Sequence, residues 1–335
     1  MRQNQSDNRM KRIYFFFYFL LVFILGISTV GLLTAYNTDT KETHKKTPLT
    51  LSMTAAIELP ESITLFGQNY PVDDVSFYER LDRELTIFTY QHGSTLLNIK
   101  RANRYFPIIE PILKAQGIPD DFKYLAVIES SLDMNAISPA KAAGIWQFME
   151  ATGKQYGLEV STDVDERYHV EKATVAACRY LKSAYNLYGD WLLAAASYNA
   201  GKGRISDELT KQKGKTFFDL HLFEETTRYI YRIMAIKEVF RQPYRYGFVL
   251  KPNHLYPPVA VNDIMVDKTI PDLALYAKEK GYSYAQLKRF NPWLRSRSLT
   301  VKEGKKYTIH LPDKKSLYRK PNSKVKVHEQ QWVEE

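Results

Sequence analysis

A single glutamate, Glu129, lies on the apolar face of a segment that is predicted to be helical. Segment 119–131 begins with a proline followed by two aspartates, which is typical of a helix start. Four of its residues recur at helical spacing, namely Phe122, Leu125, Ala126 and Glu129. A carboxyl group held against apolar side chains has a raised pKa, because burial disfavours its charged form. Glu129 is therefore predicted to hold a proton near neutral pH and to act as a general acid. The alternative is a glutamate at the helix edge that an arginine or lysine neutralises.

Four further clusters of polar or small residues could approach Glu129. They are Gly144 with Gln147 in segment 138–149, Tyr198 with Asn199 in segment 194–203, Glu225 with Thr226 and Tyr229, and Asp163 with Asp165. The glycine would let the backbone pass close to a ligand, and the amide of Gln147 offers a hydrogen-bond donor. Each cluster taken alone is also explained by helix packing, a helix cap or a turn.

The elements that must position these side chains are predicted to be mostly helices. Periodicity is clearest over 170–188, where Gly189 is expected to end the helix and Asp190 to cap the next one, over 191–199. Further helical patterns cover about 76–114, the segment around Glu129, and about 225–240. The predicted fold class is therefore mainly α, with one compact helical domain over 76–245.

The flanking segments differ from this domain in composition. A polar, Thr-rich stretch predicts a linker over 37–75, and three prolines predict a second linker over 246–261. Residues 262–312 are predicted to form a small α+β unit of a strand, two helical stretches and a closing strand. The basic tail over 313–335 has little apolar content and is predicted to be disordered.

The N-terminal residues 1–36 have the pattern of a membrane anchor. The first 12 residues carry four basic side chains, and residues 13–35 then run without a charge. That length spans a bilayer and exceeds the apolar core of a cleaved signal peptide. The basic flank places the N-terminus in the cytoplasm and the rest of the chain outside. We expect an uncleaved anchor rather than a cleaved signal.

The overall composition narrows the classes of partner and cofactor. The 335 residues carry a net charge of +10, which inside a cell would favour nucleic acid. The chain has an export segment and no nucleic-acid-binding motif, so an anionic cell envelope is the better candidate for its partner. The single cysteine, Cys178, lies in an Ala-rich helical stretch and is expected to be a core residue. The seven histidines lack ligand spacing, so no metal site and no cofactor are predicted.

Three ordered motifs resemble the signatures of the family-1, Slt-type lytic transglycosylases, which cleave peptidoglycan. The motifs are Glu129-Ser130-Ser131, Ala143-Gly144-Ile145-Trp146-Gln147-Phe148 and Tyr198-Asn199-Ala200-Gly201. The likeness covers roughly residues 105–242 and is strongest to the membrane-bound type D subgroup. It implies a goose-lysozyme-like helical fold, no cofactor, peptidoglycan glycan strands as partner, and a place at the periplasmic face of the cytoplasmic membrane.

The resemblance also implies roles for individual residues. Glu129 matches the single catalytic acid, which would protonate the bond between N-acetylmuramic acid and N-acetylglucosamine and then deprotonate the C6 hydroxyl. Positions that match the substrate-binding groove are Ser130, Ser138, Gln147, Met149, Tyr198, Asn199 and Glu225. Phe148 departs from the usual aliphatic residue, so the shape of the groove is expected to differ there.

The C-terminal unit resembles a divergent LysM module, which binds N-acetylglucosamine-containing glycans. The resemblance rests on segments 269–274, 284–292 and 301–309. The usual Gly-Asp before the first helix is missing, which leaves glycan binding by this unit an open question.

Two alternatives to a lytic transglycosylase remain at the level of the sequence. A muramidase would hydrolyse the same bond with a water molecule positioned by Asp133, Asp163 or Asp165. A catalytically inactive wall-binding or scaffold protein would keep the fold, but the joint presence of Glu129, Tyr198 and Asn199 argues against it.

Overall fold

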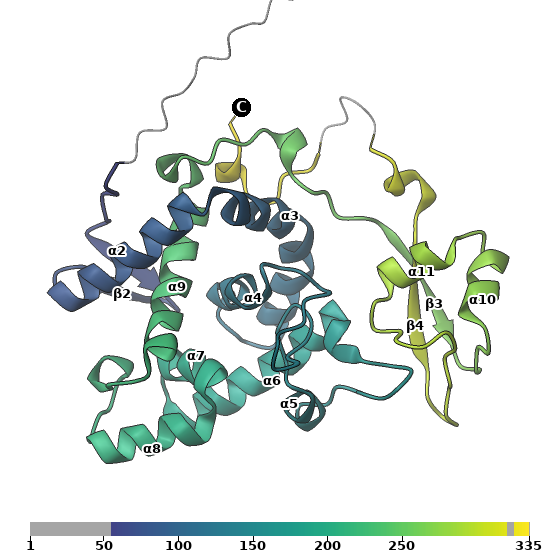
Figure 1. The fold of residues 1–335 in the computed structure, drawn as a ribbon, viewed down its shortest axis with the longest axis horizontal. Coiled ribbons are helices and arrows are strands. Elements are labelled where there is room, and N and C mark those ends of the chain that lie inside the picture. Colours follow the sequence, from purple (N-terminus) through teal and green to yellow (C-terminus); the bar gives the residue numbers. More distant parts are fainter. Residues whose placement is uncertain (1–54, 320–324, 335) are drawn as a thin grey trace, which may run out of the picture. The chain divides into compact units, whose positions relative to one another are not determined.

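Helices form most of the chain that the computed structural model describes, which is residues 55–319 and 325–334 (Figure 1). The helices of the larger part are α2 (Val75–Tyr90), α3 (His92–Ala115), α4 (Lys123–Ser130), α5 (Glu150–Gln155), α6 (Val170–Tyr188), α7 (Trp191–Ala200), α8 (Lys202–Gln212) and α9 (Glu224–Arg241). Helix α2 packs along α9, α6 packs on α3 and α7, and α4 lies among them in contact with α3 and α9. The short helix that carries Glu129 is therefore held from several sides.

Local signals in the sequence account for several helix ends. The carboxylate of Asp74 accepts a hydrogen bond from the Phe77 amide at 2.8 Å and caps α2. Asp190 caps α7 in the same way through the Leu193 amide. Gly189 ends α6 with a φ of 68°, a conformation that glycine adopts without strain.

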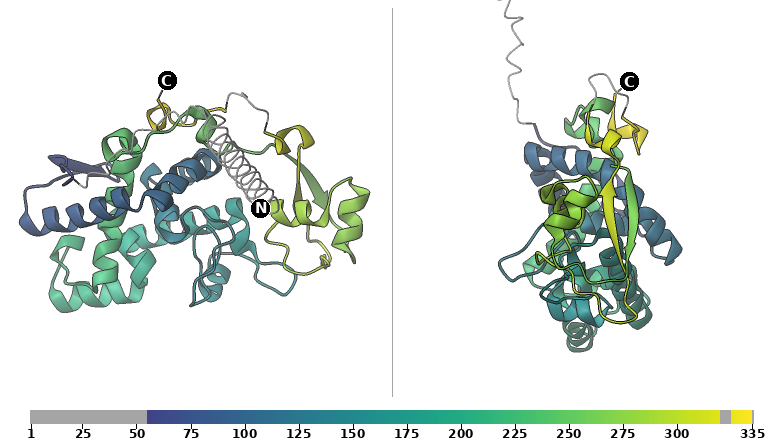
Figure 2. Two further views of the ribbon diagram at one scale, coloured as in Figure 1. Left: turned by 45° about the horizontal axis from the view of Figure 1, so that its top comes forward. Right: turned by 90° about the vertical axis from the view of Figure 1, so that its right-hand side faces the viewer.

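The C-terminal unit is a two-stranded antiparallel sheet with two short helices. Strands β3 (Val261–Val266) and β4 (Tyr307–Pro312) pair in the register Val261 with Pro312 through Val266 with Tyr307. Helices α10 (Leu273–Glu279) and α11 (Tyr284–Phe290) lie between them in sequence and beside them in space (Figure 2). The predicted class, mainly α with a small α+β C-terminal part, is confirmed.

The interior consists of two groups of buried apolar side chains. The larger group is built from the helices of residues 75–241 and from flanking segments. The smaller group lies in the C-terminal unit and includes Ala143, Val164 and Tyr168 of the helical part. Backbone hydrogen bonds from Asp165 to Trp293 and from Arg295 to Asp163 join the two parts at this place.

The segment predicted as a linker over 37–75 packs on the helices in its described portion. Residues Ser62–Leu65 (β1) and Gln68–Pro71 (β2) form a hairpin, and the side chains of Ile63 and Leu65 are buried against the helices. Burial of these apolar groups outweighs the entropy of ordering so short a hairpin.

The segments predicted as a second linker and as a disordered tail also pack on the helices. Phe248, Leu250 and Leu255 of segment 246–261 are buried. In the tail, Val325 and Trp332 are buried, and the Trp332 indole donates a hydrogen bond to the Phe240 carbonyl at 3.0 Å. Low apolar content misled the prediction because a few apolar residues, of which Trp332 is the largest, are enough to pack the segment on the core.

The predicted membrane anchor over residues 13–35 lies outside the described residues. Within residues 55–319 and 325–334, no helix combines the length and the apolar character that a membrane span needs.

Candidate functional site

Glu129 lies near the end of helix α4, and most of this helix is buried. The six residues before it, from Lys123 to Ile128, are all buried. The acids predicted for its first turn lie in a short 3-10 helix, Asp120–Phe122. There, Asp121 accepts a hydrogen bond from the Phe66 amide and pairs with Lys237 at 2.7 Å. These contacts fix α4 against the β1–β2 hairpin and α9.

The carboxyl group of Glu129 lies at the end of α4 and is largely enclosed. Its Oε1 accepts a hydrogen bond from the Tyr229 hydroxyl at 2.5 Å. Burial raises the pKa of Glu129 to about 7, while the Tyr229 hydrogen bond and the charge of Arg232 act in the opposite direction. Loss of hydration is the dominant cause, as the apolar face of the helix predicts.

The alternative of a neutralised glutamate is not supported by the geometry. Among the described residues, no lysine or arginine forms an ion pair with Glu129. Arg232 turns its guanidinium to the carbonyl oxygen of Ile128, at 3.1 Å. Glu225 raises the pKa of Glu129 through its charge but is itself exposed on α9.

The sequence named Tyr229 only as part of a cluster that could approach Glu129, and it did not single out Arg232. Together with Glu225 they occupy positions i, i+4 and i+7 of α9 and share one face of that helix. This spacing was visible in the sequence. Which helix that face meets depends on the packing of α9 against α4, which the spacing does not show.

The turn after Glu129 is fixed by hydrogen bonds and by an uncommon backbone conformation. The Ser130 hydroxyl donates to the Ile145 carbonyl at 2.8 Å, so it ties α4 to the second motif. Ser131 and Leu132 both have a φ of 55°, which few residues other than glycine adopt. Ser130 is thus placed as a tether beside the carboxyl group.

Gly144 approaches protein backbone. Its φ is 78°, and an added Cβ would lie 1.8 Å from the Arg167 carbonyl oxygen. This contact accounts for the glycine without a ligand, and the approach of a ligand to it stays a prediction. The glycine is required because segment 143–148 packs directly on the loop before α6.

Three residues in and beside the second motif were predicted to line the groove, namely Ser138, Gln147 and Met149. The Gln147 amide donates to the carbonyls of Gly144 at 2.8 Å and Ala136 at 3.3 Å, from a backbone with φ 48°. Ser138 Oγ accepts from the Ala142 amide at 3.0 Å. Met149 is exposed. Gln147 therefore has its donors engaged and its carbonyl oxygen left as an acceptor.

The third motif places Tyr198 and Asn199 at the end of α7. The Tyr198 hydroxyl donates to the Trp146 carbonyl at 2.9 Å. Its ring packs edge-on against Phe148, at a centroid distance of 5.9 Å. The unusual Phe148 is buried and supports Tyr198. Asn199 Oδ1 accepts from the Thr226 hydroxyl at 2.8 Å and so links α7 to α9.

The acids considered for water activation are engaged with protein groups. Asp165 forms a buried pair with Arg167 at 2.7 Å. Asp163 accepts from the Thr300 hydroxyl at 2.7 Å in the C-terminal unit, and Asp133 accepts from the Asn135 amide at 2.9 Å. Within the described chain, none of the three contacts Glu129. Cys178 is buried, and burial raises its pKa to about 12, as expected for a core thiol.

Family models match both parts of the chain. Residues 106–220 match the transglycosylase SLT domain, and residues 262–315 match the soluble lytic transglycosylase C-terminal LysM-like domain. The helical fold and the three motifs around Glu129 agree with the first match. Residues 106–220 therefore belong to the SLT domain family, and residues 262–315 to the LysM-like C-terminal domains of soluble lytic transglycosylases.

Curated relatives carry names from the same family. The chain is 32% identical over 245 residues to membrane-bound lytic murein transglycosylase D of Escherichia coli K12. The aligned region covers 69% of this chain and 50% of that protein. It is 30% identical over 135 residues to the peptidoglycan transglycosylase gp16 of Escherichia phage T7, covering 39% of this chain and 10% of that protein. The chain thus spans about half the length of the Escherichia coli relative.

Solved structures of lytic transglycosylases are more distant. The 70-kDa soluble lytic transglycosylase of Escherichia coli is 20% identical, with a TM-score of 0.38 over 50% of this chain and 31% of that chain. An inactive mutant of the Pseudomonas aeruginosa enzyme Slt is 20% identical, with a TM-score of 0.34 over 42% of this chain and 24% of that chain.

Proposed function

We propose that this protein is a peptidoglycan lytic transglycosylase that cleaves the β-1,4 bond between N-acetylmuramic acid and N-acetylglucosamine. The observation that carries the proposal is the carboxyl group of Glu129, whose pKa of about 7 keeps it partly protonated at neutral pH. The SLT-domain match and the names of the relatives support the substrate class.

One carboxyl group is sufficient for this reaction. Protonated Glu129 gives its proton to the glycosidic oxygen as the bond from that oxygen to C1 breaks. The N-acetyl group of the muramic acid stabilises the positive charge at C1. The Glu129 carboxylate then takes the proton of the C6 hydroxyl, whose oxygen bonds to C1. The products are a free N-acetylglucosamine end and a 1,6-anhydromuramic acid end, and no water is consumed.

The neighbouring side chains supply hydrogen-bonding groups with defined directions. Tyr229 donates to the Glu129 carboxylate and holds it in place. The Tyr198 hydroxyl gives its proton to Trp146, so its oxygen can accept a hydrogen bond from the acetamido N–H of the substrate. Gln147 offers its carbonyl oxygen to a sugar hydroxyl. Ser130, Ser138, Met149, Asn199 and Glu225 are proposed to shape or line the glycan groove.

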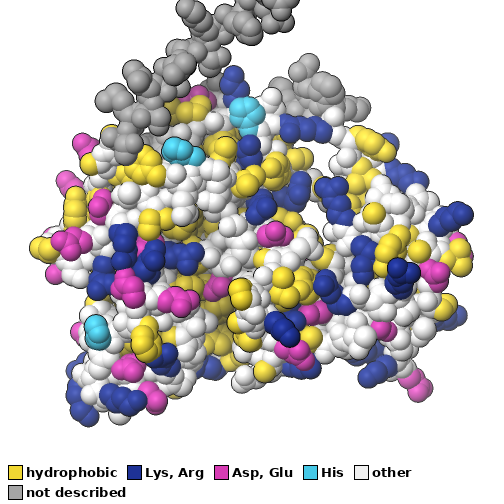
Figure 3. Space-filling model, in the orientation of Figure 1, with side chains coloured by type: hydrophobic (Ala, Val, Ile, Leu, Met, Phe, Trp, Pro, Cys, Tyr) yellow, Lys and Arg dark blue, Asp and Glu magenta, His cyan; other side chains and the backbone are white. Residues whose placement is uncertain are grey.

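Localisation and the role of the C-terminal unit belong to the same proposal. The charge-free segment 13–35 would anchor the protein in the cytoplasmic membrane with residues 36–335 on the periplasmic side. The name of the Escherichia coli relative, a membrane-bound enzyme, supports this. The LysM-like unit would hold the enzyme on glycan strands. Proteins that bind nucleic acid typically gather basic side chains in a patch or stripe. On the face in Figure 3, Lys and Arg side chains are instead intermixed with acidic ones.

Mass spectrometry of digested, purified sacculi tests the proposed reaction. We expect soluble fragments with 1,6-anhydromuramic acid ends, and their loss in Glu129→Gln. The matched control is Glu79→Gln, which removes an exposed carboxyl group of α2 and should leave the products unchanged. Reducing muramic acid ends would identify a muramidase instead. Binding of sacculi without any released fragment would indicate the scaffold alternative.

A further inference from the structure

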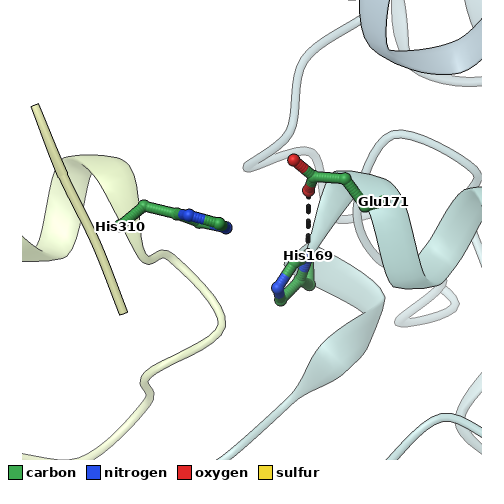
Figure 4. A group of neighbouring side chains, drawn as sticks. All are labelled: His169, Glu171 and His310. Carbon is green, nitrogen blue, oxygen red and sulfur yellow. Dashed lines mark ion pairs between the residues drawn. The ribbon is translucent and has the colours of Figure 1, made fainter. Parts of the chain in front are cut away.

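Two histidines and a glutamate that are remote in sequence meet where the C-terminal unit contacts the helical part. His169 precedes α6, Glu171 lies in its first turn, and His310 lies on β4. One ring nitrogen of each histidine and one carboxylate oxygen lie within 4.8 Å of one another. Figure 4 shows the His310 ring pointing toward the other two side chains. Sequence spacing could not reveal this cluster, because its members come from two separate parts of the chain.

Within the described part of the chain, one buried nitrogen atom of this cluster has no hydrogen-bond partner, and another faces a carboxylate. His169 is only 7% exposed, and its Nδ1 lies 3.1 Å from Glu171 Oε2. Among the described residues, His310 Nε2 is buried and makes no hydrogen bond, whereas His169 Nδ1 faces the Glu171 carboxylate. A buried polar atom without a hydrogen bond is unfavourable, so His310 Nε2 calls for an occupant that can bind it.

A contact on the far side of His310 determines which of its ring nitrogens can bind an occupant of the cluster. His310 Nδ1 lies 2.7 Å from Asp263 Oδ1 on the neighbouring strand β3. A carboxylate can only accept a hydrogen bond, so Nδ1 carries a hydrogen, and in the neutral form of the ring the lone pair is on Nε2. Histidines that bind metals commonly donate their other N–H to a carboxylate in this way. Asp263 is therefore placed as a supporting group rather than a ligand.

We propose that His169, Glu171 and His310 bind one Zn²⁺ ion that links the C-terminal unit to the start of α6. Two imidazoles and one carboxylate are a ligand set that zinc uses, with bonds near 2.0–2.2 Å in a tetrahedron. Ligand atoms at those bond lengths stand roughly 3.3 Å apart, close to the 3.1 Å between His169 Nδ1 and Glu171 Oε2. The other separations between the ligand atoms are at most 4.8 Å.

The surroundings provide an entry path and a fourth position. All three side chains line one cavity of about 540 Å³. The residues Leu132 to Asn135, which follow Glu129 in the chain, line the same cavity. A water molecule in this cavity would complete the tetrahedron. Two of the three arginines on its wall donate to backbone oxygens: Arg101 to the Ser131 carbonyl at 2.9 Å and Arg104 to the Pro257 carbonyl at 3.1 Å.

Calorimetric titration of the full chain with ZnCl₂ tests the proposal. The protein is purified without a polyhistidine tag and freed of metal with a chelator. We expect one zinc ion per chain and a higher midpoint of thermal unfolding in its presence, since an ion that binds the folded state stabilises it. Mg²⁺, which prefers oxygen ligands, should neither bind at this site nor raise the midpoint.

Substitutions assign the site. His310→Gln and Glu171→Gln should each weaken zinc binding by at least about tenfold, and Asp263→Asn by about 10- to 100-fold. The carboxylates of Glu171 and Asp263 are 44% and 62% exposed, so their variants are expected to fold, which circular dichroism checks. His221→Gln, an exposed histidine far from the cluster in sequence, is the matched control. The absence of zinc binding by the full chain, or unchanged binding in Glu171→Gln and Asp263→Asn, would overturn the proposal.

Discussion

The carboxyl group of Glu129 destabilises the folded protein when it is ionised. Its pKa is about 7 in the folded protein and 4.5 in a free side chain, so the folded state binds this proton more tightly. Stability contributed by the proton is therefore fully present below about pH 4.5 and is lost as the pH rises to about 7. The loss amounts to about 3 kcal/mol at most. The property that suits Glu129 for acid catalysis thus weakens the fold.

Glu129→Gln is expected to inactivate the enzyme and to stabilise it at neutral pH. A neutral amide avoids the burial of a charge and can still accept the Tyr229 hydrogen bond. The gain in unfolding free energy should reach about 1–3 kcal/mol above pH 7 and vanish near pH 4. Urea denaturation at several pH values measures it. An equal gain at both pH values would contradict the raised pKa.

Tyr229→Phe is expected to shift the pH dependence of the reaction. The Tyr229 hydroxyl stabilises the ionised carboxylate, so its removal raises the pKa of Glu129 further. The basic limb of kcat/KM on soluble glycan strands should then move up by about one pH unit. Tyr244→Phe, which alters a tyrosine that is 69% exposed, is the control and should leave the profile in place. A basic limb that moves down would refute the assigned hydrogen bond.

At the level of elements, the loop of residues 136–148 depends on a close backbone contact. Gly144→Ala would bring a methyl group to 1.8 Å from the Arg167 carbonyl at a φ of 78°. We expect this variant to lose about 4 kcal/mol or more of unfolding free energy, or to accumulate as insoluble protein. Gly203→Ala in α8 meets no atom within 4 Å and should be neutral or slightly stabilising. Chemical denaturation of both variants compares them.

The elements that could be predicted from the sequence are those whose signals are local. Helix α6 has the predicted bounds, 170–188, because a regular apolar face ends at a glycine in the left-handed conformation. The face of α4 likewise predicted the enclosure of Glu129. The Tyr229 hydrogen bond could not be predicted, because it depends on how α9 packs against α4. The same is true of the β1–β2 hairpin, whose stability comes from helices far along the chain.

At the level of the whole molecule, the chain returns to its helical part after the LysM-like unit. Residues 325–334 pack near α3 and α9: Asn103 donates to the Lys326 carbonyl at 3.1 Å and accepts from the His328 amide at 2.8 Å. His328 also pairs with Glu110 at 2.8 Å. The LysM-like unit is therefore inserted between two segments of the helical core rather than appended to it. Motions of that unit are restrained at both of its ends.

Trp332 is expected to be the main anchor of this returning segment. Its indole lies 5.9 Å from the Phe106 ring and 5.6 Å from the Phe240 ring, and its side chain is 2% exposed. Trp332→Ala should reduce the unfolding free energy by about 3–5 kcal/mol, since it removes a large buried side chain and leaves a cavity. Tyr318→Ala, at a position that is 76% exposed, should stay within about 0.5 kcal/mol of the wild type.

Thermal and urea unfolding of the two variants decide the role of the segment. A loss confined to Trp332→Ala means that the C-terminal residues complete the core of the helical part. Limited proteolysis adds a local readout, because a detached segment is cut more readily than one held by the Phe240 hydrogen bond. Equal stability of Trp332→Ala and the wild type would show instead that the helices hold their packing without the segment, as a disordered tail would require.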